Sequence, residues 1–321
     1  MQVLTPAPPN NLIIRRRERD VADTHTPEKK RNVVKEKTEE LYDDQVQFFA
    51  HGQADGRSVQ KSLARARVLL VGAGAVGSHA ANSLAAAGVG QLQLLDPAKA
   101  TPEDTRASAL LEAEDAGRPR AEALAAHVAR RNRHVEASVK TADLTSVEHV
   151  EGALGGTDCV VACLDSPAPH LLHVLNQAAL RANRRLIVGQ IYQGVGIVGP
   201  TVIPRQSPCY QCYELRRNAN LPNYEEVRQY ENWLRELPGV RSEVVAPRPL
   251  VAVLGHLVAL EAFRLLTGTT HPQTVGHILR VDFYAPAMTY HRVLRLPNCP
   301  ACGYHNQRGL PQNVADKLTH G

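Results

Sequence analysis

The chain has 321 residues, of which 43% are hydrophobic and 21% are charged. This composition is typical of a folded protein with a large apolar core, and it excludes a wholly disordered or collagen-like chain. The net charge of +5 at pH 7 is small for this length. It therefore gives no electrostatic case for nucleic acid binding, and it is compatible with a small anionic ligand.

The first forty residues differ in composition from the rest of the chain. They contain four prolines and two basic clusters, at residues 15–17 and 29–31, with few apolar positions. Residues 1–40 are therefore predicted to be a flexible arm or a plain solvated tail. No apolar stretch of the kind found in a secretory signal peptide occurs there, so we expect a cytoplasmic protein.

From residue 67 onward, short apolar runs alternate with stretches of good helix-forming residues. This pattern predicts strands at 68–71, 92–95, 159–164 and 186–188, and helices at 78–87, 120–131 and 171–182. Alternation of this kind builds a parallel sheet with helices on both faces, so the predicted fold class is α/β.

A longer apolar stretch covers residues 250–266. It is interrupted by His256, Glu261 and Arg264, which are costly inside a lipid bilayer. The stretch therefore predicts a buried helix rather than a membrane span.

Three glycines, Gly72, Gly74 and Gly77, form a GxGxxG turn between the first predicted strand and helix. Backbone without side chains lets N–H groups and the helix dipole approach a phosphate. Asp96 follows Gly77 by nineteen residues, at a strand end where a carboxylate can accept both ribose hydroxyls. The set predicts adenine nucleotide binding, whereas the alternative is a turn used only for close helix packing.

Two CxxC pairs, Cys209 with Cys212 and Cys299 with Cys302, are separated by 86 residues. Four thiolates from two turns are the usual ligands of a closed, tetrahedral zinc site. Such a metal would be structural, because no coordination position is left for water or substrate. The alternative is four buried cysteines without a ligand.

The remaining cysteines and two histidines favour structural roles. Cys159 and Cys163 lie in a predicted buried strand and are expected in the core. His170 and His173 are three residues apart on one predicted helix. No carboxylate partner or metal-binding spacing accompanies them, so we assign them structural or surface roles.

Together these features resemble the ThiF/MoeB/HesA superfamily of adenylating enzymes, which are related to ubiquitin-activating enzymes. The resemblance runs from Tyr42 to Cys302 and rests on YDDQVQFF, VGAGAVGS, LLD, GRPRAEAL, CLD, PCYQC and CPACG. The ending HRVLRLPNCPACG looks most like the branch found in clusters that mature ribosomally made peptides, including thiazole/oxazole-modified peptides and thiopeptides. Residues 41–305 are then expected to form the nucleotide-binding adenylation domain, with 306–321 as a tail.

The resemblance implies an eight-stranded, largely parallel, Rossmann-like sheet with structural Zn²⁺, usually in a homodimer. It also implies a reaction in which a C-terminal carboxylate of a precursor peptide or small carrier protein attacks the α-phosphorus of ATP·Mg²⁺. The products are an acyl-adenylate and pyrophosphate. Neither nucleic acid nor membrane is an expected partner.

Individual roles follow from the same resemblance. Asp165 matches the aspartate that holds Mg²⁺ near the phosphates, and Arg120 matches a lysine that contacts them. The alternative for Asp165 is a cap on the helix that follows it, since aspartate favours that position. The alternative for Arg120 is a solvated first-turn arginine.

The chain departs from the family pattern at three positions. Asp104 and Ala107 stand where an asparagine and an arginine are usual, and Asp44 stands where an arginine is common. We expect Arg106 to replace the arginine missing at 107, with a surface arginine as the alternative. The family's arginine at the position of Asp44 reaches across the dimer to the phosphates, and Arg57, or an arginine of the arm, is the candidate to compensate for it.

Relatives that form a thioester or persulfide often have a cysteine in the segment that corresponds to the residues between Glu214 and Pro249, and this chain has none there. Covalent carrier transfer is therefore disfavoured. Tyr224, Tyr230 and Trp233 in this segment indicate a peptide-binding surface or packing.

Two other functions stay open. Asp44 and Ala107 favour a non-adenylating protein that binds a precursor peptide and presents it to a separate enzyme such as a YcaO-type cyclodehydratase. Missing positive charge weakens transition-state stabilisation more than it disturbs a fold. The glycine turn and Asp96 alone also fit an NAD-dependent oxidoreductase.

Overall fold

The structure is a computed structural model that describes residues 41–51, 55–165, 168–192, 194–236, 246–285 and 287–303. Residues 44–321 form one compact unit and residues 1–43 form another. The predicted arm at 1–40 and the predicted tail at 306–321 lie outside the described residues. The division into arm, domain and tail therefore stays a prediction.

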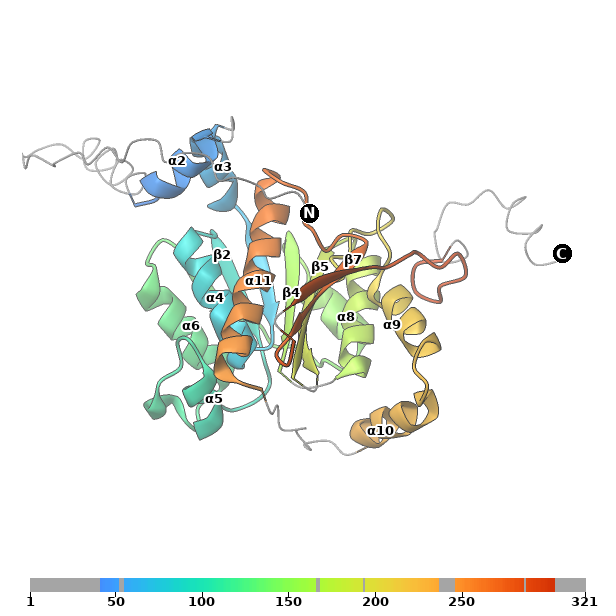
Figure 1. Ribbon diagram of the computed structural model, residues 1–321. Helices are drawn as coiled ribbons and strands as arrows, with labels where there is room; N and C mark the ends of the chain where they lie inside the picture. The colour runs from blue at the N-terminus through green and yellow to red at the C-terminus, as the bar shows by residue number, and fades with distance from the viewer. Residues whose placement is uncertain are drawn as a thin grey trace, which may run out of the picture. The chain divides into compact units, whose positions relative to one another are not determined.

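The described residues of the larger unit contain an eight-stranded sheet in the order β3-β2-β1-β4-β5-β6-β7-β8 (Figure 1). Its strands are β1 (Arg67–Val71), β2 (Gln91–Leu95), β3 (Glu136–Val139), β4 (Cys159–Leu164), β5 (Arg185–Tyr192), β6 (Val195–Val198), β7 (His277–Asp282) and β8 (Met288–Arg292). Strands β1 to β5 pair in parallel, and β6, β7 and β8 are added antiparallel. The predicted α/β class with a largely parallel sheet is confirmed.

Helices connect and cover these strands. They are α2 (Asp43–His51), α3 (Gly56–Leu63), α4 (Ala75–Ala87), α5 (Pro102–Ala107), α6 (Arg120–Arg131), α7 (Val147–Ala153), α8 (Pro169–Arg181), α9 (Tyr210–Ala219), α10 (Tyr224–Glu236) and α11 (Arg248–Thr267). All seven elements predicted between residues 68 and 188 are present. The largest differences are that α4 begins three residues earlier than predicted, and that β5 continues four residues beyond its predicted end.

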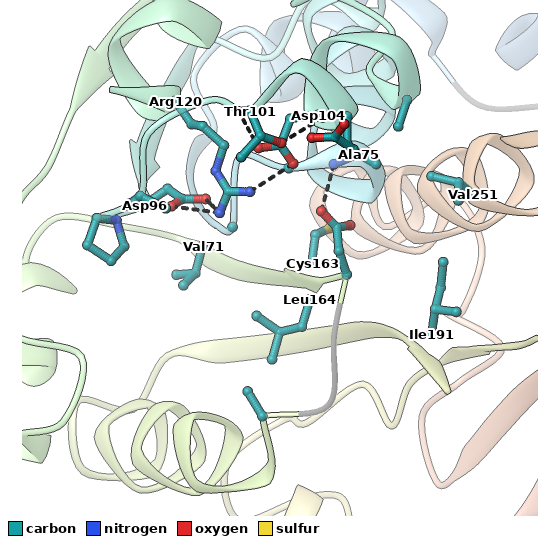
Figure 2. Close-up of a pocket in the computed structure, with 18 of the residues that line it drawn as sticks. Val71, Ala75, Asp96, Thr101, Asp104, Arg120, Cys163, Leu164, Ile191 and Val251 are labelled. Carbon is teal, nitrogen blue, oxygen red and sulfur yellow. Dashed lines mark hydrogen bonds and ion pairs between the residues drawn. The ribbon is translucent and has the colours of Figure 1, made fainter. Parts of the chain in front are cut away.

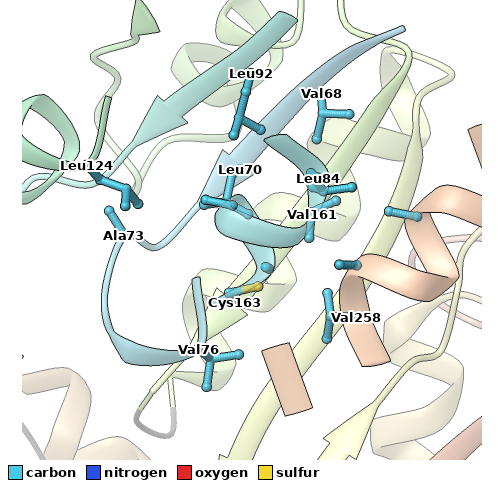
Figure 3. Close-up of a cluster of buried hydrophobic side chains, with 14 of the residues drawn as sticks. Val68, Leu70, Ala73, Val76, Leu84, Leu92, Leu124, Val161, Cys163 and Val258 are labelled. Atoms are coloured by element: carbon cyan, nitrogen blue, oxygen red, sulfur yellow. The ribbon is translucent and has the colours of Figure 1, made fainter. Parts of the chain in front are cut away.

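The parallel strands bury side chains on both faces. In β1, Val68 and Leu70 belong to a core cluster that includes residues of α4, α6 and α11, as Figure 3 shows for part of it. Leu69 and Val71 belong to a second cluster, with residues of α7, α8 and α9. Because successive side chains of a strand point to opposite faces, a continuous apolar run is what a sheet covered on both sides requires.

The apolar stretch predicted as a buried helix is α11. Among the described residues it is the one helix long and apolar enough to cross a membrane by length and composition, and half of its most apolar window is buried. Leu254 and Val258 pack in the core cluster shared with α4. The core of a folded domain accounts for this helix.

The strand order places a site at one edge of the sheet. Strand β1 pairs with β2 on one side and β4 on the other, so the chain changes direction across the sheet at β1. Ligands of open α/β sheets bind outside the carboxyl ends of the strands at such a switch point. The glycine turn follows β1, Asp96 follows β2 and Asp165 follows β4.

Candidate active site

A cavity of about 600 Å³ lies at this edge, within the size range of small-molecule sites. Its lining includes Gly72, Gly74, Asp96, Asp104, Ala107, Arg120, Asp165, Ile191, Arg248 and Val251. The structure thus brings together Gly72 and Gly74 of the glycine turn, the two strand-end acids and Arg120, whereas Gly77 is not part of the lining. Figure 2 shows the labelled members of this set.

The three glycines are required by close approaches of the backbone. Gly72 has a φ of +93°, and a Cβ on it would lie 2.0 Å from the carbonyl oxygen of Cys163. A Cβ on Gly77 would lie 1.9 Å from the carbonyl oxygen of Gly72, so this glycine serves close packing of the turn. A Cβ on Gly74 would lie 1.8 Å from Oδ2 of Asp165. Gly74 thus keeps the start of α4 open toward the strand-end acid.

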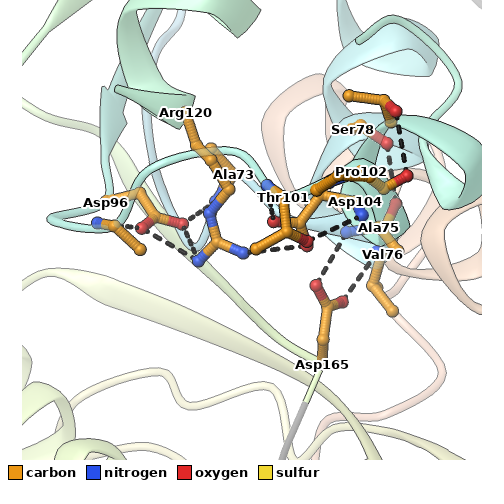
Figure 4. A network of polar contacts seen from close by, with 12 residues as sticks. Ala73, Ala75, Val76, Ser78, Asp96, Thr101, Pro102, Asp104, Arg120 and Asp165 are labelled. Atoms are coloured by element: carbon orange, nitrogen blue, oxygen red, sulfur yellow. Dashed lines mark hydrogen bonds and ion pairs between the residues drawn. The ribbon is translucent and has the colours of Figure 1, made fainter. Parts of the chain in front are cut away.

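Asp165 covers the amino end of α4. Its Oδ2 accepts a hydrogen bond from the backbone N–H of Ala75 at 2.7 Å, and its Oδ1 accepts one from Val76 at 2.8 Å (Figure 4). The alternative that Asp165 caps the following helix is wrong, because α8 begins at Pro169 and has Ala168 at its cap position. The carboxylate occupies the N–H groups that a phosphate would use.

Burial raises the pKa of the Asp165 carboxyl above its ordinary value, and the charge of Asp104 adds to the rise. The N–H groups of Ala75 and Val76, together with Arg120, oppose the rise without cancelling it. Asp165 therefore takes up a proton at a higher pH than an exposed aspartate does. As the pH falls, its negative charge is lost at a higher pH than that of an exposed aspartate.

Arg120 is held between two carboxylates. Its Nη2 lies 2.8 Å from Oδ2 of Asp96, and its Nη1 lies 3.2 Å from Oδ1 of Asp104. The alternative of a solvated arginine is wrong, because the side chain is only 13% exposed. Burial alone would lower the pKa of Arg120. The charges of Asp96 and Asp104 raise it by more than burial lowers it, so the net shift is upward.

Asp96 is bound by the protein itself. Its Oδ2 accepts a hydrogen bond from Ala73 N–H at 2.7 Å and its Oδ1 accepts one from Ala98 N–H at 2.8 Å. Arg120 Nη2 approaches both oxygens, at 2.8 and 3.0 Å. These contacts fill the acceptor positions of the carboxylate. Ribose hydroxyls can use Asp96 only when Arg120 gives up its contacts there.

Asp104, the first departure from the family pattern, has two roles in this structure. Its Oδ2 accepts from Thr101 N–H at 2.9 Å in the capping box that begins α5, and its Oδ1 pairs with Arg120. The fork of Arg120 suits this arrangement, since a guanidinium can contact two carboxylates at once. Asp104 and Arg120 therefore form one ion-paired unit in the cavity lining.

Arg106 and Arg57, expected to compensate for Ala107 and Asp44, are not part of the described cavity lining, and the arginines of the arm lie outside the described residues. Arg106 is exposed on α5 and pairs with Glu103 at 2.8 Å. Arg57 is exposed on α3, and neither arginine is part of the lining, whereas Ala107 is. The spacing of Arg106 in sequence was a poor guide, because one position along a helix turns a side chain by about 100°.

Arg248 is a cavity residue that sequence reasoning missed. It is the first residue of α11, and Val251, one turn later, lines the cavity as well. The apolar pattern of this helix indicated a core element only. The one available signal was a basic residue at the start of an apolar helix, where the helix dipole disfavours positive charge.

The four cysteines of the CxxC pairs meet in the core, as predicted. Their Sγ atoms all lie within 4.8 Å of one another. Cys209 is 3.7 Å from Cys299, and Cys212 is 3.5 Å from Cys302. A tetrahedron with zinc–sulfur bonds of about 2.3 Å has sulfur–sulfur edges of about 3.8 Å. The donor set and its size fit zinc.

The other predicted side chains are distributed as follows. Cys159 and Cys163 are buried core residues, as expected, and burial raises the pKa of Cys159 to about 12. The expectation that His173 has no carboxylate partner is wrong, because its Nε2 contacts Oε2 of the buried Glu214. Glu214 lies on α9, 41 residues later in the chain, so helical spacing did not reveal it.

The aromatic residues of α10 are exposed. Tyr224, Tyr230 and Trp233 have exposed fractions of 37%, 40% and 49%. Tyr230 and Trp233 stack on each other, with ring centroids 6.0 Å apart. Packing into the core does not account for these side chains.

Comparison with known proteins places the chain. Residues 42–301 match the ThiF family. The chain belongs to this family. It is 30% identical to the molybdopterin-synthase adenylyltransferase of Salmonella typhimurium, over 76% of this chain and 90% of the relative. It is 31% identical to the sulfur carrier protein adenylyltransferase of Thermus thermophilus, over 77% of this chain and 86% of the relative.

The fold has solved counterparts. MccB of E. coli, a microcin C7 biosynthetic enzyme, superposes with a TM-score of 0.71 in its complex with N-formylated MccA. The sequence identity is 21%, and the match covers 82% of this chain and 75% of MccB. The family and its relatives make this chain a ThiF-family adenylyltransferase that uses ATP. They favour this activity over that of an NAD-dependent oxidoreductase, which the glycine turn and Asp96 also fitted.

Proposed function

We propose that this ThiF-family protein adenylylates the C-terminal carboxylate of a precursor peptide or small carrier protein. The observation that carries the proposal is the single cavity that gathers the glycine turn, Asp96, Arg120 and Asp165. Relatives named for molybdopterin synthase and for sulfur carrier proteins suggest the carrier class of acceptor. Two features suggest peptide maturation. One is the likeness to MccB, solved with N-formylated MccA, and the other is the motif HRVLRLPNCPACG, which contains the second CxxC pair.

In the proposed reaction, an oxygen of the ionised carboxylate attacks the α-phosphorus of ATP. A bond from this oxygen to phosphorus forms, and the bond from the α-phosphorus to its bridging oxygen breaks. Pyrophosphate leaves with the electron pair of that bond, and no proton has to move. Such a transfer needs alignment and neutralisation of charge more than covalent help from the protein.

The geometry supports a division of roles among the cavity residues. The amino end of α4 offers N–H groups to the phosphates, Asp96 accepts the ribose hydroxyls and Arg120 neutralises phosphate charge. In the structure these groups bind one another. Binding of ATP is therefore an exchange, in which Arg120 passes from carboxylates to phosphates and Asp96 becomes available to the ribose.

Two metal ions belong to this proposal. Asp165 would hold Mg²⁺, because carboxylate oxygen is the ligand this ion prefers, and the ion would neutralise charge on the phosphates. The residues Cys209, Cys212, Cys299 and Cys302 would hold a structural Zn²⁺, which the separations of their sulfur atoms fit. We also expect a homodimer, as the family resemblance implies, and a location in the cytoplasm. Analytical ultracentrifugation tests the oligomeric state.

The test is exchange of labelled pyrophosphate into ATP, measured with Mg²⁺ and with candidate acceptors of both classes. Asp165→Ala should abolish exchange, because it removes the proposed ligand of the ion. A matched control is Asp143→Ala, since Asp143 is an exposed aspartate that does not line the cavity. Equal exchange by the Asp165→Ala protein and the unmodified protein would exclude the proposed role of Asp165.

A second function has support from the cavity as well. Ala107 leaves one wall without the usual arginine, and Asp104 holds Arg120 by its charge. Both features favour a protein that binds a precursor peptide and presents it to a separate cyclodehydratase. Titration of a labelled precursor peptide with and without ATP separates the two functions. Binding of the peptide that is independent of ATP supports presentation as a function beside adenylylation.

A further inference from the structure

The cavity holds more acidic than basic side chains. Its described lining contains four carboxylates and two arginines: Asp96, Glu103, Asp104, Asp165, Arg120 and Arg248. A triphosphate that enters this space meets a net negative charge, which opposes binding. The positive charge available to it therefore decides how well it can be held.

The two arginines differ in how their charge is used. Arg120 is 13% exposed and is paired with Asp96 and Asp104. Arg248 is exposed, and it forms no hydrogen bond or ion pair with any residue that the structure describes. Among the described lining residues, Arg248 is thus the cation whose charge is not already neutralised.

The position of Arg248 in its helix points to an anion outside the helix. Arg248 is the first residue of α11, where the helix dipole is also positive. A cation there does not stabilise its own helix. The charge of the side chain and the dipole instead act together on an anion in front of the helix.

The α11 wall lies where the distal phosphates are expected. In Figure 2, Arg120 and Asp96 lie on one side of Ala75, the first residue of α4, and Val251 lies on the other side. Helices α11 and α4 approach closely, since a Cβ on Gly255 would lie 2.7 Å from the carbonyl oxygen of Val76. A nucleotide with its ribose at Asp96 and its phosphates at the amino end of α4 therefore extends toward α11.

We propose that Arg248 contacts the β- and γ-phosphates of ATP, the part that leaves as pyrophosphate. Arg248 on α11 thereby supplies a positive charge that α5 lacks, because Ala107 stands where an arginine is usual in the family. This assignment rests on the proposed use of the cavity for ATP. It adds a catalytic residue that sequence spacing did not indicate.

Nucleotide affinity tests this assignment without a known acceptor. We expect Arg248→Gln to weaken binding of ATP·Mg²⁺ by roughly 10- to 100-fold, the usual effect of losing a hydrogen bond to a charged group. Binding of AMP should change by less than about twofold, because AMP has no phosphate that reaches α11. Arg248→Lys should recover part of the lost affinity, since it restores a point charge.

Arg106→Gln and Arg133→Gln are matched controls, because both remove an exposed arginine outside the described cavity lining. Calorimetry on the four variants and the unmodified protein, each checked by thermal unfolding, gives the comparison. Equal weakening of ATP and AMP by Arg248→Gln would overturn the phosphate contact, and so would an unchanged affinity for ATP. If the unmodified protein binds ATP but Arg248→Gln does not weaken ATP more than AMP, the Arg248 assignment alone fails. If the unmodified protein binds no nucleotide, the proposed function fails with it.

Discussion

The cysteine cluster and the nucleotide cavity are both built from groups that carry or acquire charge, but they differ in how that charge is neutralised. In the cluster, four sulfur atoms of one kind face one another within 4.8 Å. As thiolates they repel one another, so only a cation can hold them together. In the cavity, Arg120 pairs with Asp96 and Asp104, and N–H groups of α4 bind Asp165, so each of these three acids has a partner within the chain. The cavity can therefore fold without its ligand.

This contrast separates residues that the fold depends on from residues that mainly bind ligand. Loss of an ion from the cluster should unfold the region where α9 meets the segment after β8, because its side chains belong to the second core cluster. Loss of a ligand from the cavity should only restore the internal pairs. The following substitutions test each half of the contrast.

The largest effect is expected for Cys209→Ser. It removes one of four proposed zinc ligands from a fully buried position, and we expect a loss of about 3–5 kcal/mol of unfolding free energy together with loss of bound zinc. Urea unfolding and metal analysis by mass spectrometry measure both quantities. Cys159→Ala, a buried cysteine outside the cluster, should cost only about 1 kcal/mol. Equal losses for the two variants would contradict the metal site.

Gly74→Ala should act on binding rather than on folding. The added Cβ would lie 1.8 Å from Oδ2 of Asp165, so the turn or the acid has to move. Displacement of a positioned group by about 1 Å can cost about 100-fold, so we expect affinity for ATP·Mg²⁺ to fall by up to this factor. Calorimetry with ATP·Mg²⁺ measures the loss. The control is Gly152→Ala in α7, where an added Cβ meets nothing within 4 Å. Nucleotide affinity should stay unchanged there, and unaltered affinity in Gly74→Ala would exclude the turn as the phosphate site.

Asp104→Asn should have the smallest effect, in the opposite direction. Asparagine keeps an oxygen for Thr101 N–H and removes one negative charge beside Arg120. We expect affinity for ATP·Mg²⁺ to rise by up to about tenfold, since one repulsive charge is gone. Glu103→Gln also removes an acid from the lining, but Glu103 is 67% exposed and screened by solvent. Glu103→Gln should therefore change affinity less than Asp104→Asn does. Weaker ATP binding by Asp104→Asn would contradict the idea that Asp104 repels the phosphates and holds Arg120 away from them.

Local sequence patterns predicted the parallel half of the molecule well. Strand β4 and helix α6 have the predicted bounds, because buried parallel strands are continuous apolar runs and the helices between them are rich in helix-forming residues. The antiparallel strands β6 to β8 were not predicted individually. Strand β8 is exposed along its whole length, so it lacks the apolar alternation that identifies a strand.

The residues of the candidate site also fall into two groups, those that local sequence patterns predicted and those that they did not. Gly72, Gly74, Gly77, Asp96 and Asp165 were predictable because each stands at a fixed place relative to a strand end. The pairing of Arg120 with Asp104 joins residues 16 positions apart, and Arg248 reaches the cavity from a helix far along the chain. Contacts of this kind depend on tertiary packing, which no local spacing encodes.

The carboxylate of Asp165 on the first turn of α4 has a practical consequence for inhibitor discovery. Its oxygens accept hydrogen bonds from the N–H groups proposed for phosphate, and the chain holds them there at high effective concentration. Simple anions such as sulfate should therefore compete poorly, and rigid docking against this conformation should reject true nucleotide analogues. Compounds that bring a divalent ion to draw the carboxylate away are the better starting point.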